Sequence, residues 1–310
     1  MSRRRAATLA VALVIAVGSA SSATPAGAAD DVAAVNGEGI SVAGVGDVID
    51  ALVASDIGWE VNPGNGTIPA DRARLVVETQ LLNTARRQFI AENEIELPAD
   101  LDEAAADDML AQQGLDSLAG AARDMVVEQI VTSQQIGTAE LDVNLEDRAE
   151  QYQDNPVSLG VVCVNLLLFA DEGDADRAAD ALRAGDAASD VAETFGAEPG
   201  STDVQCISTT ELGAAAPGVL ASVVDLSAGD VLDPQVGATG WQVIGMPEFA
   251  DVVEPLGAYL DAPAPSAQGG IVTTGQILFD GWLLAADIDV DARYGRWDPV
   301  TSTIVPLGQE

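Results

Sequence analysis

Apart from its carboxylates, this 310-residue chain has few residues that could do covalent or acid–base chemistry, and two cysteines stand out among them. Cys163 and Cys206 are the only cysteines, and they do not form a Cys-x-x-Cys pair. All 13 basic residues are arginine, because the chain contains no His and no Lys. An imidazole base, a Schiff-base amine and a zinc site of the His/Cys type are therefore excluded. We expect neither a metal ion nor a cofactor.

Acidic residues dominate the charge of the chain. There are 50 Asp and Glu, which gives a formal net charge of -37. A nucleic-acid partner is disfavoured because the phosphate backbone would be repelled. High acidity keeps an exported protein soluble, and a cationic partner is the alternative interpretation. The alternating acids Asp287, Asp289 and Asp291 lack the Gly and the terminal Glu of a calcium-binding EF-hand loop. They are more typical of a strand with outward-facing Asp side chains.

The N-terminus has the pattern of a signal peptide over residues 1–28. Three Arg at positions 3–5 precede an apolar run over residues 6–17, and Ala26-Gly27-Ala28 matches a cleavage site. The apolar run is short for a membrane span, so we expect an exported protein with no stable span after cleavage. An anchor formed by an uncleaved signal is the alternative.

Export changes the interpretation of the two cysteines. In an oxidising compartment an even number of cysteines favours a disulfide, here between Cys163 and Cys206. Closing such a loop would stabilise the fold by about 3–4 kcal/mol in the chain-entropy model. Two buried free thiols are the next interpretation. A redox role is least favoured, because no Lys or His is present to lower a thiol pKa.

The hydrophobic pattern divides the chain into a helical half and a mixed half. Asn36-Gly37 predicts a tight turn between two short apolar segments, and Ser41 is a natural N-cap for the next helix. Helices are predicted over residues 42–55, 70–93, 101–112, 115–136 and 145–154. An α+β segment follows, with strands within 157–169, 196–208 and 231–246 and helices within 175–184, 191–195 and 217–225. Beyond it we expect helices over 252–260 and 276–286, a linker over 262–270, and two strands joined at Asp298-Pro299.

The order of several short motifs resembles that of a known family. They are Val35-Asn36-Gly37-Glu38-Gly39-Ile40-Ser41, the strand from Cys163 to Leu168, the segment from Val224 to Ile244, and Tyr294-Gly295-Arg296-Trp297-Asp298. Together they resemble SurA-type exported chaperones, in the form found in actinobacteria, with a parvulin-type (PpiC-like) peptidyl-prolyl isomerase domain. The resemblance implies an α+β fold with four parts: a signal peptide over 1–28, a helical chaperone-like domain over 29–155, a parvulin-like domain over 157–249, and a segment over 250–310 that packs back on the helical domain.

The chain departs from this family at the positions that the resemblance assigns to catalysis. Asn165 stands where a first His is expected and Gln242 where a second is expected, while Glu198 is the nearest counterpart of an intervening Cys or Asp. Ala215 and Val219 align with the large apolar residues of the proline pocket. Amide side chains form hydrogen bonds but do not titrate, so Asn165 and Gln242 are expected to bond each other or the backbone. Glu198 is equally typical of a solvated loop acid.

These departures give three hypotheses for function. The first is an exported chaperone-like protein that binds unfolded or extended polypeptides and whose parvulin domain has lost most or all catalysis. The second is an active peptidyl-prolyl isomerase with an altered site. The third is a structural or interaction protein of the cell envelope. A pocket lined by small side chains loses about 0.8 kcal/mol of apolar contact per missing methylene, which favours the first hypothesis.

Overall fold

The computed structural model describes residues 31–55, 68–98, 103–139, 141, 143–198, 203–237, 240–261 and 273–308. The predicted signal peptide and the linker over 262–270 lie outside these residues. The chain forms two compact units. Unit 1 comprises Met1–Ile136 and Ala286–Glu310, and unit 2 comprises Gly137–Ala285. Each unit combines helices with antiparallel strands, so the α+β fold class is confirmed.

Unit 1 begins with a hairpin whose turn was predicted from its sequence. Strands β1 (Asp31–Val35) and β2 (Glu38–Ser41) are antiparallel, and β7 (Ile288–Val290) pairs with the other side of β1. The two residues between β1 and β2, Asn36 and Gly37, have φ angles of 48° and 82°. Positive φ at both central residues is the geometry of a type I′ turn, for which Asn-Gly is the preferred sequence.

Helices make up most of unit 1. They are α1 (Val42–Ala54), α2 (Ala70–Glu92), α3 (Glu103–Gln112) and α4 (Gly120–Thr138). The Oγ of Ser41 accepts a hydrogen bond from the Gly44 N–H at 3.0 Å, as expected for an N-cap. Helix α4 begins five residues later than predicted, because residues 115–119 form a turn in which the Leu118 N–H donates to the Leu115 carbonyl.

The end of the chain completes unit 1. Strands β8 (Arg296–Asp298) and β9 (Thr303–Val305) form the predicted two-stranded hairpin. Two side chains of α2 hold this segment by its backbone. The Ile304 N–H donates to the Glu78 carboxylate at 2.8 Å, and the Nε of Arg74 donates to the Tyr294 carbonyl at 2.9 Å. Burial raises the pKa of Glu78.

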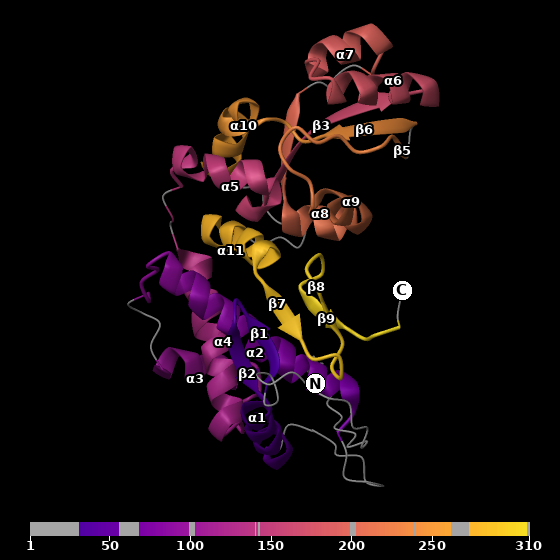
Figure 1. Ribbon diagram of the computed structural model, residues 1–310. Helices are drawn as coiled ribbons and strands as arrows, with labels where there is room; N and C mark the ends of the chain where they lie inside the picture. Colours follow the sequence, from indigo (N-terminus) through magenta and orange to yellow (C-terminus); the bar gives the residue numbers. More distant parts are fainter. Residues whose placement is uncertain are drawn as a thin grey trace, which may run out of the picture. The chain divides into compact units, whose positions relative to one another are not determined.

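Unit 2 contains a four-stranded antiparallel sheet with the order β4-β3-β6-β5 (Figure 1). The strands are β3 (Val161–Phe169), β4 (Val204–Ser208), β5 (Gln235–Val236) and β6 (Trp241–Gly245). Helices α6 (Glu172–Arg183) and α7 (Ala188–Phe195) lie on one side of the sheet and share a core with Leu167 and Phe169. Helices α8 (Thr209–Ala215) and α9 (Pro217–Val223) lie on the other side (Figure 1).

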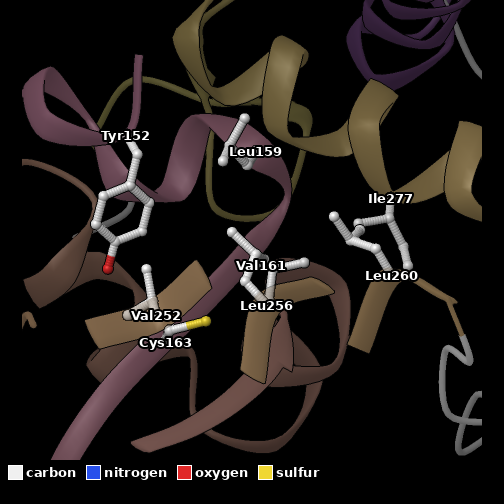
Figure 2. Packing of buried hydrophobic residues seen from close by; sticks show 8 residues of the cluster. All are labelled: Tyr152, Leu159, Val161, Cys163, Val252, Leu256, Leu260 and Ile277. Atoms are coloured by element: carbon white, nitrogen blue, oxygen red, sulfur yellow. The ribbon is translucent and has the colours of Figure 1, made fainter. Parts of the chain in front are cut away.

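A second core of unit 2 contains the start of β3. Its shell is formed by the 3-10 helices η1 (Leu145–Arg148) and η2 (Pro156–Leu159) and by α5 (Ala149–Asp154), α10 (Phe249–Asp261) and α11 (Thr274–Ala285). Figure 2 shows the buried side chains, which are Tyr152, Leu159, Val161, Cys163, Val252, Leu256, Leu260 and Ile277.

The placement of residues 250–285 corrects the sequence prediction. We expected this segment to pack on the helical domain, but α10 and α11 belong to unit 2, and only residues after 285 join unit 1. The reason is the stripe Val252, Leu256 and Leu260, which has the four-residue spacing of one helix face. This stripe covers Val161 and Cys163 of β3, so the apolar start of the strand is buried within its own unit.

Helix α11 approaches η2 more closely than side chains would allow. A Cβ added to Gly281 would lie 2.0 Å from the backbone N of Gly160, and one added to Gly160 would lie 1.7 Å from the carbonyl O of Ile277. Gly160 also has a φ of +75°, in the left-handed region that favours glycine. The two glycines therefore permit direct backbone packing between α11 and the segment that leads into β3.

Candidate functional site

The two cysteines form a covalent link across the sheet. Cys163 of β3 and Cys206 of β4 are direct register partners, and their sulfurs are bonded. Cys163 is fully buried in the second core of unit 2, whereas Cys206 is partly buried against it. The bond therefore fastens the edge strand β4 to the central strand β3. Among the described residues there is no free cysteine.

The pairing of β3 with β6 decides which predicted site residues share a face. Asn165 pairs with Gly245 and Leu168 pairs with Gln242, in an unbroken register. Successive side chains of a strand point to opposite faces, and directly opposed residues share a face. Asn165 therefore lies on the face of Leu167 and Phe169, while Gln242 lies on the face of Leu168.

The expectation that Asn165 and Gln242 bond each other is therefore wrong. They occupy opposite faces of the sheet and cannot line one pocket. The β3 residue that shares a face with Gln242 and lies diagonally across from it is Leu166, one position after Asn165. A shift of one residue along a strand moves every side chain to the other face, and the sequence motif did not define this register.

Asn165 occupies a junction on the covered face. The residues two positions before and after it, Cys163 and Leu167, belong to the two separate cores of unit 2. Its cross-strand partners are Val204 of β4 and Gly245 of β6, and its side chain is half-buried. The side chain of Asn165 is thus a single amide group between two apolar cores.

The opposite face of the sheet is partly open and carries three glutamines. It is formed by alternate residues of β3 and their cross-strand partners, and we call it the glutamine face. Its members are Val164, Leu166 and Leu168 of β3, Gln205 of β4, Gln235 of β5 and Gln242 of β6. Gln205 is exposed and the other five are half-buried, whereas Val162 and Ile244 on the same face are buried. One end of this face is covered and the other is accessible.

The remaining predicted site residues lie in three different segments of the chain. Glu198 is an exposed residue after α7, and its backbone N–H donates to the Leu168 carbonyl at 2.9 Å. Ala215 is exposed at the end of α8, and Val219 is half-buried in α9. Helices α8 and α9 lie on the side of the glutamine face, so these two residues and Gln242 are on the same side of the sheet (Figure 1).

A polar network anchors α8 and was not foreseen from the sequence. Ser208 is the N-cap of α8, and its Oγ accepts a hydrogen bond from the Glu211 N–H at 3.1 Å. The hydroxyl of Tyr259, from α10, accepts from the Ser208 N–H at 3.0 Å and donates to the Glu211 carboxylate at 2.9 Å. Burial raises the pKa of Tyr259. The Ser-x-x-Glu pattern of a capping box is present in the sequence, but the bridging tyrosine is 48 residues away.

Further contacts fix the start of α8. The Thr209 N–H donates to the Gly160 carbonyl at 2.9 Å, and the Thr210 hydroxyl donates to the carboxylate of Asp280 in α11. The strand β4, which the disulfide holds, leads directly into this helix. Helix α8 is thus attached to β3, α10 and α11, and its position beside the sheet is well defined.

The glutamine face carries no titratable side chain. Its six side chains are aliphatic or amide, and none of them titrates near neutral pH. In the part of the chain that the structure describes, no group of three or more Cys, Asp and Glu is arranged to hold a metal ion. No described helix is long and apolar enough to cross a membrane. Apolar contact and amide hydrogen bonds are the interactions that this face offers.

Comparison with known proteins gives structural likenesses but no sequence family. Neither a protein-family model nor a curated protein matches the chain. Among solved structures, PrsA from Bacillus subtilis matches over 64% of this chain and 84% of its own, with 15% identity and a TM-score of 0.26. A chain from a study of two SurA-like chaperones of Campylobacter jejuni, PEB4 and the periplasmic Cj1289, matches over 84% of this chain and 99% of its own, with 14% identity and a TM-score of 0.25.

Proposed function

We propose that this protein is an exported, chaperone-like protein that binds extended or unfolded polypeptide on the glutamine face of unit 2 and has little or no prolyl isomerase activity. In this proposal residues 1–28 are a signal peptide, unit 1 is a helical chaperone-like domain, and residues 157–249 of unit 2 are a parvulin-like domain that has lost its catalytic groups. The client is a polypeptide rather than a nucleic acid, because the chain has a formal net charge of -37.

The observation that carries the proposal is the identity of the side chains on the glutamine face. Gln242 has an aliphatic residue, Leu166, diagonally across from it, and the polar residue Asn165 is on the other face. Isomerisation of a prolyl bond must lower a barrier of about 18–20 kcal/mol, which requires polar groups placed beside a twisted amide. A face of aliphatic side chains and glutamines, with no titratable group, is better suited to holding a chain than to distorting its amide.

The arrangement also suits a polypeptide as the ligand. Amide side chains both donate and accept hydrogen bonds, as a polypeptide backbone does. Gln235 and Gln242 are direct cross-strand neighbours, and Gln242 is in turn the cross-strand neighbour of Leu168. An extended segment placed there could bury apolar side chains against Leu166 and Leu168 and bond its backbone to the two amides.

An aggregation assay with two adjacent substitutions tests the proposal. Leu166→Asn removes apolar surface from the glutamine face, whereas Asn165→Ala changes a neighbouring residue on the opposite face. We expect the mature chain to keep an unfolded client soluble, Leu166→Asn to weaken this effect several-fold, and Asn165→Ala to leave it intact. Thermal unfolding of each variant shows whether the fold is preserved. Equal loss with both folded variants would contradict the glutamine face as the binding surface.

A protease-coupled assay on Xaa-Pro peptides tests the catalytic part. We expect the mature chain not to raise the isomerisation rate above the uncatalysed rate, because no titratable side chain lines the face. Fast isomerisation that Gln242→Ala abolishes would favour the second hypothesis, an active isomerase with an altered site. Absence of both activities would favour a structural role in the cell envelope.

A further inference from the structure

We propose that the glutamine face selects cationic clients, namely extended segments of unfolded polypeptide in which Lys or Arg residues flank apolar ones. This inference rests on the proposed function and adds a class of client to it. It combines two independent observations. The first is the half-open aliphatic and amide surface of the sheet, and the second is the strong negative charge of unit 2.

The unit that carries the glutamine face is strongly acidic. Residues 137–285 contain 25 acidic residues and three Arg, which gives a formal net charge of -22. A surface with such an excess of one sign attracts ligands of the opposite sign and repels those of the same sign. An anionic polypeptide would meet repulsion at every approach to unit 2.

The three Arg of unit 2 are engaged in contacts within the unit. Arg148 donates to the side chain of Gln151, and Arg177 pairs with Asp174 and lies over the ring of Phe195. Arg183 pairs with Asp180 and with Asp233. These contacts offset only a small share of the 25 acidic residues. The positive charge that would balance the remainder must therefore come from counterions or from a client.

Acidic residues lie beside the glutamine face. Asp203 is exposed and immediately precedes β4, the strand of Gln205. Asp225 is exposed and follows α9, a helix on the same side of the sheet as the glutamine face (Figure 1). The face itself contains no charged side chain. A segment whose apolar residues contact Leu166 and Leu168 would therefore carry its flanking residues toward these acidic residues, where a Lys or Arg is favoured.

Binding of three matched peptides to the mature chain tests this inference. The peptides are disordered, equal in length and apolar content, and differ in whether their polar positions are Lys, Ser or Glu. At about 20 mM salt we expect the Lys peptide to bind about tenfold or more tightly than the Ser peptide, and the Glu peptide to bind most weakly. At about 0.5 M salt screening reduces the advantage of the Lys peptide to about twofold.

Two double variants locate the effect. Asp203→Asn with Asp225→Asn removes two charges beside the glutamine face, and Asp47→Asn with Asp50→Asn removes two exposed charges from α1 in unit 1. We expect the first variant to weaken binding of the Lys peptide about threefold or more and the second to change it less than twofold. Binding of the Ser peptide should be unchanged in both.

The possible outcomes separate this inference from the function on which it rests. Equal affinity for the Lys and Ser peptides would overturn the charge selection but leave polypeptide binding intact. An equal effect of the two double variants would overturn its location at the glutamine face. If none of the three peptides binds, the proposed function fails and the inference fails with it.

Discussion

Units 1 and 2 both combine helices with a small antiparallel sheet, but different forces hold their distant segments together. In unit 1, polar side chains of α2 form hydrogen bonds and salt bridges with elements that are distant in sequence. Gln88 donates to the Val35 carbonyl, Asn83 donates to the Met125 carbonyl, and Arg87 pairs with Glu38 of β2 and Glu128 of α4. In unit 2, the fixed points are a disulfide, backbone packing at two glycines and two apolar cores.

The two units thus hold distant segments of the chain together in different ways. The last strands of unit 1 come from the far end of the chain. Hydrogen bonds between side chains of α2 and the backbone of this segment hold them in place without a large apolar surface. Unit 2 presents one partly open face to solvent. Its remaining parts must therefore be rigid enough to keep α8 and α9 in place beside that face.

The glycine contact between α11 and η2 should be the position in unit 2 that tolerates substitution least. Gly281→Ala would place a Cβ 2.0 Å from the backbone N of Gly160, so the helix must move. We expect a loss of about 4 kcal/mol or more in the free energy of unfolding, measured by chemical denaturation. Gly218→Ala in α9 is the matched control, because nothing lies within 4 Å of its added Cβ. It should be neutral or stabilising.

Removal of the disulfide should destabilise unit 2, because the unfolded chain gains conformational freedom when the loop is opened. The double variant Cys163→Ala with Cys206→Ala frees a loop of 43 residues. We expect a loss of about 3–4 kcal/mol, with unit 1 little affected. Hydrogen exchange resolved by segment measures both units at once. Equal deprotection of β1 and of β4 would show that the units do not unfold separately and would weaken the comparison.

The tyrosine that bridges the N-cap of α8 should contribute a smaller amount. Tyr259→Phe leaves the buried Ser208 N–H without its acceptor and Glu211 without a donor. We expect a loss of about 1–2 kcal/mol and faster amide exchange in α8. Tyr294→Phe in unit 1 is the control, since no hydrogen bond to the Tyr294 hydroxyl is observed and its ring is retained. A larger effect from the control would argue against the anchoring role.

Alkaline pH should destabilise unit 2 through its buried tyrosines. Burial is the main cause that raises the pKa of Tyr152, with Glu248 and Asp251 adding to it. A raised pKa means that the folded state holds the phenol proton more tightly than the unfolded state. The resulting stability is present below about pH 10 and is lost as the pH rises further. Denaturation midpoints between pH 8 and 11 measure this slope, which Tyr152→Phe should flatten.

The hydrogen bond between the Ile304 N–H and Glu78 in unit 1 should have a small, pH-dependent effect on stability. Because burial raises the pKa of Glu78, its neutral form is favoured in the folded state, and this stability is lost as the pH rises through the folded pKa. Glu78→Gln keeps an acceptor for the Ile304 N–H without a buried charge. We expect a rise in Tm of about 1–3 °C at pH 7 that vanishes near pH 4. A constant or negative shift would contradict the burial argument.

Local signals in the sequence predicted the elements well. The Asn36-Gly37 turn, the Ser41 N-cap and the long helix α2 follow from residue types whose conformational preferences are strong. Likewise, the two cysteines and the inference of export were enough to predict the bond that the structure contains. These features depend on neighbouring residues or on composition, and tertiary packing does not override them.

Strand register and long-range packing could not be predicted from the sequence. The assignment of Asn165 and Gln242 to one site failed because a motif on one strand does not specify how that strand pairs with another. The packing of α10 on unit 2 depends on a core whose members lie about 100 residues apart in the chain. The Tyr259 bridge combines a recognisable capping box with a residue that no local pattern could indicate.

The central claim is that a polypeptide client contacts the glutamine face rather than the helices on the other side of the sheet. Site-specific photo-crosslinking tests it directly, with a photoreactive side chain at position 242 on the glutamine face or at position 193 on the exposed surface of α7. With an unfolded Lys-rich client, we predict strong crosslinking from position 242 and only background from position 193. Equal crosslinking from both positions, or crosslinking from position 193 alone, would contradict the claim.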